Sequence, residues 1–277
     1  MTTRKYLLKK TRADHPLLAR PFYKLVRDAI NKLETVALAD LEAIEAEIKK
    51  IPAPPSPEPT PVDMAKLLQP VRDQGQQGSC FAFAGTAAQA LCEGIQAGAV
   101  ATNVYAPADL SWNTRAIMGT TDQDSGGDLG DAIQAQEQTG TCLEALMPYN
   151  QDVFAVAPDA AAVGDQGSHK AKFKAYPIDI SEAGNITQAL ADGCPVYFGF
   201  NVWNGFESTG SDGVVPDPDG SSLGGHANLL YFDPACPSGF WADQNSWGDG
   251  WGLGGRCWFP VSGLPTFIEA FALVGVT

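Results

Sequence analysis

The pattern of apolar and polar residues divides most of the chain into a helical part and a strand-rich part. Between residue 80 and about residue 150, helix-forming and apolar residues gather in runs between glycine-rich loops, which predict helices over 80–98, 106–118 and 129–138. From about residue 170, short apolar runs between turns predict strands over 172–178, 196–202, 227–232 and 256–261, with one short helix over 185–192. Helices followed by strands indicate an α+β protein.

The first 51 residues form a separate extension that favours helix. Residues 23–30 and 38–51 are rich in strong helix formers, and the second stretch carries an apolar stripe of Leu38, Leu41, Ile44 and Ile48. Residues 52–61 contain six prolines, which give an extended and semi-rigid linker. We therefore expect three parts: the helical extension 1–51, the linker 52–61 and a main domain 62–277, with a helical lobe at about 77–150 and a β-rich lobe at about 170–277.

Charge is unevenly distributed along the 277 residues, whose formal net charge is −14 at pH 7. Residues 1–50 carry 11 Lys and Arg against 7 Asp and Glu, so they are net +4 and the remaining chain is net −18. An acidic body of this kind repels nucleic acid and anionic membranes, and it attracts basic segments, including its own N-terminus. Two solvated faces would give the same charge pattern, so charge alone assigns the N-terminus no role.

Composition and motifs disfavour several classes of protein. No run of about 18 apolar residues predicts a transmembrane helix, and the basic residues 1–10 lack the apolar region of a secretory signal. We expect no cofactor and no metal, since neither a phosphate-binding glycine motif nor zinc-site cysteine spacing occurs. Six cysteines are too few for a disulfide scaffold at this length. The compartment stays open, as does the pairing of Cys92, Cys142, Cys194, Cys236 and Cys257.

Cys80 stands where a glycine-rich turn, residues 74–79, meets the first predicted helix of the main domain. Its sulfur is then expected at a helix N-terminus, where unpaired N–H groups and the helix dipole favour an anion. Because the thiolate is the reactive form of cysteine, this position suits a nucleophile. A cysteine that begins a buried helix is more often an inert core residue, so the assignment depends on its partners.

Two such partners lie near the other end of the chain. His226 enters an apolar strand, and Asn245 lies in the tight aromatic turn 244–252. Cys80, His226 and Asn245 thus supply a nucleophile, a base and an orienting amide in that order. On these three motifs the chain resembles the papain-like cysteine peptidases of clan CA over about residues 62–258, and its short N-terminal extension resembles that of bacterial members. The other two histidines, His15 and His169, are expected to be exposed bystanders.

The resemblance implies both a fold and a mechanism. The fold would have two lobes, one mainly helical and one β-barrel-like, with the active-site cleft between them. Cys80 would attack the scissile carbonyl as part of a thiolate–imidazolium pair with His226, and water would then hydrolyse the acyl-enzyme. Asn245 would orient the imidazole, and Gln74, six residues before the nucleophile, would donate a hydrogen bond to the oxyanion. The implied partners are peptide or protein substrates.

The resemblance also maps residues that contact the substrate. Gly126 and Gly127 would pair with its backbone, and Trp247 would cover the hydrogen bond between the histidine and the asparagine. Four further positions would lie near an apolar pocket, namely Leu129, Gly199, Phe200 and Gly224. Gly225 stands directly before the histidine, where the family often has Asp or Asn, so a hydrogen bond from that side chain is missing.

One departure from the family concerns a disulfide. Papain-like peptidases usually have a cysteine three residues before the nucleophile, bonded to a second cysteine in a later loop. Gln77 and Asp124 occupy these two positions here. Since both cysteines are absent together, we expect this part of the site to be held without its usual crosslink.

Members of this family are commonly made with an N-terminal segment that lies through the cleft. The resemblance therefore implies that residues 1–51 include a propeptide-like inhibitor, and the alternative is a structural brace packed away from the site. Two other functions remain open. One is a Cys–His acyltransferase of the transglutaminase or peptide ligase type, and the other is a catalytically silent binding protein with the same fold.

Overall fold

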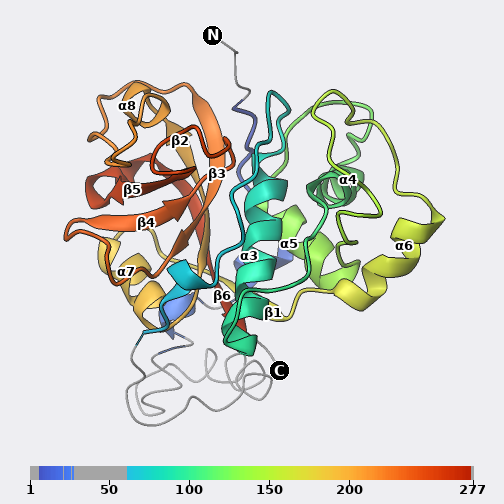
Figure 1. The fold of residues 1–277 in the computed structure, drawn as a ribbon, viewed down its shortest axis with the longest axis horizontal. Coiled ribbons are helices and arrows are strands. Elements are labelled where there is room, and N and C mark those ends of the chain that lie inside the picture. The colour runs from blue at the N-terminus through green and yellow to red at the C-terminus, as the bar shows by residue number, and fades with distance from the viewer. Residues whose placement is uncertain (1–5, 21, 26, 28–60, 276–277) are drawn as a thin grey trace.

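The computed structural model describes residues 6–20, 22–25, 27 and 61–275. Within these ranges a helical half and a β-sheet lie side by side, and the N-terminal segment runs between them (Figure 1). The helix predicted over 38–51 lies outside the described residues, as does the linker apart from Pro61. Of the helix predicted over 23–30, residues 23–25 and 27 are described and are helical.

The helical half is built around α3 (Cys80–Ala97), whose small and apolar side chains are buried along most of its length. It ends at Gly98, which has a φ of 66° and returns its N–H to the carbonyls of the last turn. Two further helices pack against α3, and shorter helices complete the layer. Their bounds are Pro107–Met118 (α4), Leu129–Gln138 (α5) and Ala160–Gln166 (α6), with the 3₁₀ turns Pro16–Ala19 (η1), Met64–Lys66 (η2) and Gly167–His169 (η3).

Six antiparallel strands form one open sheet in the order β1-β6-β2-β3-β4-β5. Their bounds are Phe173–Pro177 (β1), Val196–Val202 (β2), Gly224–Tyr231 (β3), Phe240–Gln244 (β4), Arg256–Pro260 (β5) and Phe267–Gly275 (β6). The sequence pattern predicts four of these strands and misses β4 and β6. The connections include Ala183–Ala191 (α7), Asn204–Glu207 (α8) and the 3₁₀ turn Val261–Thr266 (η4).

The two halves meet where α3 packs against β2, β3 and β6. Tyr197 on β2 is fully buried, and its hydroxyl donates a 2.6 Å hydrogen bond to the carbonyl of Phe81 in the first turn of α3. The β2–β3 register sets His226 opposite Phe200. The start of the central helix is therefore fixed against β2, which pairs with the strand β3 that carries the predicted base.

A second core lies on the far side of the sheet and is largely aromatic. Phe198 stacks on Phe200 with ring centroids 5.2 Å apart, and it also contacts Phe259 at 5.4 Å and Phe267 at 4.6 Å. Such contacts stabilise a core beyond the burial of area alone. None of the helices in the described part of the chain is long and apolar enough to cross a bilayer.

We predict that Phe198→Ala lowers the free energy of unfolding by about 3–5 kcal/mol, because the buried ring leaves a cavity among its aromatic neighbours. Val163→Ala is the control, since this side chain is 53% exposed on α6 and should change stability little. Chemical denaturation followed by tryptophan fluorescence measures both variants. A loss below 1 kcal/mol for Phe198→Ala would contradict the rigid packing inferred for this core.

Candidate active site

Cys80 is the first residue of α3 and is completely buried. Burial raises the pKa of its thiol to about 12, although the backbone N–H groups of Ala227, Phe81 and Cys80 itself act in the opposite direction. Two of these N–H groups belong to the first turn of the helix, and the third follows His226 on β3. The sulfur thus lies between the helix start and the strand, and burial in this covered form favours the neutral thiol.

His226 and Asn245 form a direct hydrogen bond. The distance between His226 Nε2 and Asn245 Oδ1 is 2.8 Å, and the N–H of Ser246 donates to the same oxygen at 2.7 Å. Because an amide oxygen only accepts hydrogen bonds, Nε2 must carry a proton. In the neutral ring, Nδ1 is then the nitrogen that can accept a proton from a thiol.

Aromatic rings surround this hydrogen bond and keep water away from it. The Trp247 ring lies 4.7 Å from the His226 ring at an angle of 34°, and Phe206 packs edge-on against Trp247. His226 itself is completely buried. Phe200 contacts the imidazole edge-on at 5.8 Å, so it borders the base from within the aromatic core.

Gln74 is buried and its side-chain amide is held at both ends. Its Nε2 donates to the carbonyl of Gln77 at 2.9 Å, and its Oε1 accepts from the hydroxyl of Ser246 at 2.6 Å. The backbone N–H of Gln74 donates to the carbonyl of Ser246 at 2.9 Å. One N–H of the amide remains for another acceptor. Ser246 is not among the residues predicted from the sequence, although its position directly after Asn245 is a usable signal.

The N-terminal segment pairs with the backbone of both halves. The N–H of Leu8 donates to the carbonyl of Gly225 at 3.2 Å, and the N–H of Lys9 donates to the carbonyl of Gly127 at 2.9 Å. Tyr6 lies edge-on to both His226 and Trp247. The segment therefore covers residues from the helical half and from the sheet at the same time.

Glycines allow this close approach. A Cβ at Gly126 would collide with the carbonyl of Leu7, and one at Gly199 would collide with the side chain of Leu8. Similar collisions with Tyr6 and Leu8 would occur at the two glycines that precede His226. We call this surface of Gly126, Gly127, Gly199, Gly224 and Gly225 the covered face.

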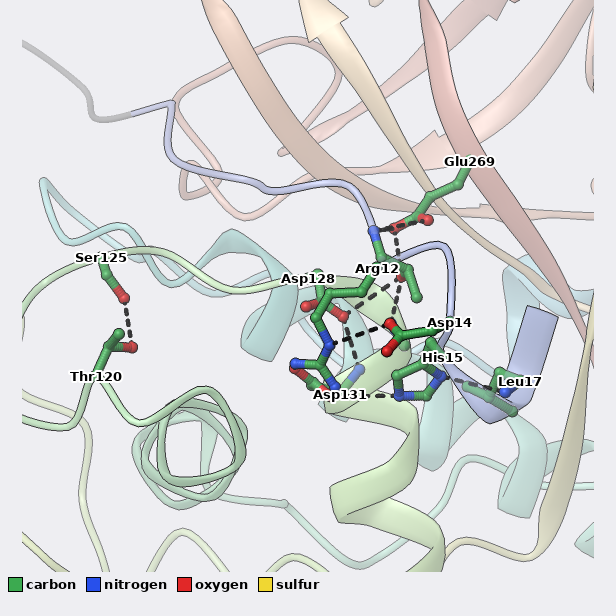
Figure 2. Close-up of polar contacts among 11 residues, drawn as sticks. Arg12, Asp14, His15, Leu17, Thr120, Ser125, Asp128, Asp131 and Glu269 are labelled. Atoms are coloured by element: carbon green, nitrogen blue, oxygen red, sulfur yellow. Dashed lines mark hydrogen bonds and ion pairs between the residues drawn. The ribbon is translucent and has the colours of Figure 1, made fainter.

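Further along, the segment is anchored by buried polar groups (Figure 2). The backbone N–H of Thr11 donates to Glu269 Oε2 at 3.1 Å, and its hydroxyl donates to Oε1 at 3.0 Å. Arg12 makes two hydrogen bonds to Asp131, at 3.0 and 3.2 Å. His15 Nε2 lies 3.3 Å from the same carboxylate. We call these five residues the anchor cluster.

Burial shifts the ionisation of this cluster. It raises the pKa of Glu269 to about 7 and that of the neighbouring Asp128 to about 6. It lowers the pKa of His15, whose Nδ1 accepts a hydrogen bond from the N–H of Leu17. The expectation that His15 is exposed is wrong, because the segment folds it against α5. His169 is also not an exposed bystander, since it is half-buried beside Asp165.

The covered face and Trp247 account for six of the eight predicted substrate-binding residues. Each of the six lies against the N-terminal segment or pairs with its backbone. Leu129 and Phe200 are instead completely buried, Leu129 in the core around α3 and Phe200 in the aromatic core. Among the described residues, no cluster of three or more His, Cys, Asp or Glu side chains could hold a metal ion.

The turn before Cys80 is held by hydrogen bonds. Asp124 Oδ1 accepts from the N–H of Gly78 at 3.0 Å, and the amide of Gln77 lies 3.4–3.5 Å from the carbonyls of Gln151 and Val153. All six cysteines are free thiols. Gln77 and Asp124 therefore replace a covalent link by separate polar contacts.

We predict that iodoacetamide labels Cys80 slowly at neutral pH and that the rate rises about tenfold per pH unit from pH 7 to 10. A raised pKa means that the thiolate fraction grows only as the pH approaches about 12. Peptide mass spectrometry of the labelled chain measures the rate, with Cys80→Ser as the control. A labelling rate that is already constant at pH 7 would contradict a neutral thiol in the covered form.

Comparisons with known proteins match this arrangement. The sequence profile of papain family cysteine proteases matches residues 58–261. A peptidase C1-like protein of Acanthamoeba polyphaga mimivirus is 31% identical over 202 residues, which are 66% of this chain and 61% of that relative, so the match spans less than two thirds of the relative.

Solved structures share the fold. Xylellain, a cysteine protease from Xylella fastidiosa, has a TM-score of 0.69 and 26% identity, covering 83% of this chain and 92% of its own. The ragweed pollen cysteine protease Amb a 11, solved in its proform, has a TM-score of 0.64 and 21% identity, covering 81% of this chain and 69% of its own. The predicted α+β papain-like fold is thereby confirmed, and the chain belongs to the papain family of cysteine proteases.

Proposed function

We propose that the protein is a cysteine endopeptidase and that residues 6–20 cover its substrate cleft in a latent form. The observation that carries the peptidase assignment is the 2.8 Å hydrogen bond between His226 on β3, which packs against α3, and Asn245, which directly follows β4. This bond leaves one imidazole nitrogen to exchange a proton with the thiol, which is what a cysteine nucleophile requires.

In the proposed reaction, His226 Nδ1 takes the proton of Cys80 and the resulting thiolate attacks the scissile carbonyl. The imidazolium then donates this proton to the departing amine, and the acyl group stays on the sulfur. A water molecule, deprotonated by His226, releases the acid and restores the thiol. The N–H of Cys80 and the remaining N–H of Gln74 stabilise the oxyanion in both steps.

The latent form is supported by the backbone groups that the segment uses. The carbonyls of Gly225 and Gly127 accept hydrogen bonds from Leu8 and Lys9, so an extended substrate that needs these carbonyls must displace the segment. Cys80 is completely buried in this form, and its burial raises the pKa of the thiol, which favours the unreactive neutral state. Amb a 11, whose fold is similar, was solved as a proform, in line with a latent state here.

The peptidase assignment is tested by substitutions at the reacting pair. We predict that Cys80→Ala abolishes hydrolysis of a fluorogenic peptide amide and that His226→Ala lowers kcat by about 10²–10⁴-fold. His169→Ala is the matched control, because this half-buried histidine lies beside Asp165 and away from Cys80. Hydrolysis that survives Cys80→Ala would exclude the mechanism. Transfer to an added amine that outpaces hydrolysis would identify an acyltransferase instead.

The covering role is tested by loosening the anchor cluster. We predict that Thr11→Val combined with Arg12→Ala raises the initial rate of peptide hydrolysis about tenfold, because the covered state loses hydrogen bonds that the open state does not make. Lys10→Ala, in an exposed residue of the same segment, should leave the rate unchanged. Equal rates in the double variant and the unmodified chain would favour a structural brace over an inhibitor.

A further inference from the structure

The turn that precedes Cys80, residues 74–79, must hold two groups in place. It ends at the N–H of Cys80, and it begins with Gln74, whose amide is fixed by contacts on both sides. No disulfide supports the turn, since all six cysteines are free. The backbone of the turn must therefore be held in position by non-covalent contacts.

Asp124 makes such a contact two residues before the nucleophile. Its Oδ1 accepts a 3.0 Å hydrogen bond from the N–H of Gly78. A Cβ at Gly78 would lie 3.1 Å from the same oxygen, so the carboxylate also packs directly against this backbone. A hydrogen bond to a charged acceptor is stronger than one between neutral groups.

Arg115 on α4 fixes the loop that carries Asp124. Its guanidinium is buried and donates to the carbonyl of Gln123 at 2.9 Å and to that of Phe154 at 2.6 Å. Burial lowers the pKa of Arg115, and the charge of Asp124 opposes that shift, so the two charges stabilise each other. Arg115 on α4 thus holds the backbone of Gln123, the residue directly before Asp124.

The second loop that Arg115 holds also supports the turn. Tyr149 lies in this loop, and its hydroxyl donates to the carbonyl of Gln74 at 2.8 Å and contacts the hydroxyl of Ser79 at 2.8 Å. The buried Arg115 guanidinium therefore supports both loops that contact the turn, one through Asp124 and the other through Tyr149.

We propose that Asp124 is a positioning residue of the reaction, which fixes the Gly78 backbone so that the N–H of Cys80 and the amide of Gln74 converge on the oxyanion. This inference rests on the proposed peptidase function. Oxyanion donors act only when they lie about 2.7–3.1 Å from the place that the charge will occupy, so a small displacement of the turn weakens them. The oxyanion forms only during the reaction, so the loss of its donors lowers kcat, whereas a displacement of Gly126 and Gly127, which follow Asp124 in the same loop, would raise KM.

The test compares Asp124→Ala with Asp124→Asn, which keeps an acceptor oxygen. We expect kcat to fall about tenfold in Asp124→Ala with KM nearly unchanged, and to recover most of its value in Asp124→Asn. Asp122→Ala is the matched control, because Asp122 is exposed in the same loop. Since Leu7 also packs against Gly78, each variant is measured again in the Arg12→Ala background, where the segment is loosened.

A double variant, Gln77→Cys with Asp124→Cys, supplies a covalent support in place of the hydrogen bond. After oxidation with glutathione disulfide, it should regain the kcat that Asp124→Ala loses, expressed per Cys80 titrated by an epoxide inhibitor. Mass spectrometry verifies the crosslink. The inference is overturned if Asp124→Ala keeps its kcat in both backgrounds, if Asp122→Ala loses as much, or if the crosslinked variant stays slow. If the chain hydrolyses no peptide even when Thr11→Val and Arg12→Ala loosen the segment, the proposed function fails, and the rate at which the epoxide labels Cys80 in each variant still tests the positioning role.

Discussion

The contact between the first turn of α3 and strand β3 is the constraint on which the rest of the site depends. A thiol at a helix start has a favourable electrostatic environment, but it becomes a nucleophile only when a base faces it. Tyr197 is buried between the two halves, where its hydroxyl donates a hydrogen bond to the carbonyl of Phe81 in the first turn of α3. Since β2 pairs with β3 in a fixed register, this contact also sets the position of His226. The relative position of Cys80 and His226 is thus set by contacts within the core.

The same burial that creates the site opposes its chemistry. In the covered form the Cys80 thiol has no access to water, and its pKa rises to about 12 despite three nearby N–H groups. A thiolate–imidazolium pair needs either solvent or a substrate carbonyl to stabilise its charges. In the proposed latent form the reaction is blocked twice, because the segment lies on the glycines proposed to bind the substrate and because burial of Cys80 favours the uncharged thiol.

The parts of the fold that the sequence predicts are those with strong local signals. The helices α3, α4 and α5 follow long runs of helix formers, and the predicted bounds of α5 coincide with the observed ones. Strand β6 was missed because its Glu, Ala and Leu residues are also helix formers, and β4 was missed because the buried Asp243 interrupts its apolar pattern. In both strands the conformation depends on pairing with neighbouring strands, and a short stretch of sequence carries no information about that pairing.

The candidate site shows the same division. Its motifs identify Cys80, His226, Asn245 and Gln74, because each belongs to a short stretch with a chemical purpose. Contacts between segments that are far apart in the sequence are not indicated by any such motif. Thr11 and Glu269 are 258 positions apart, and neither stands in a motif. His15 was taken for a bystander because nothing in its neighbourhood indicates that α5 will bury it.

The covered face raises a question of selectivity that its glycines alone do not answer. Gly126, Gly199 and Gly225 have no side chain, so they admit any extended backbone, whether it belongs to the segment or to a substrate. A Cβ at any of them would exclude both, and these positions cannot favour one over the other. The preference for the segment must then arise outside the shared surface. It arises where Thr11 meets Glu269 and where Arg12 meets Asp131, since these contacts need a particular sequence at a particular distance from the glycines. In the proposed function, latency and catalysis thus share one surface, and the contacts beside it favour the segment over a substrate.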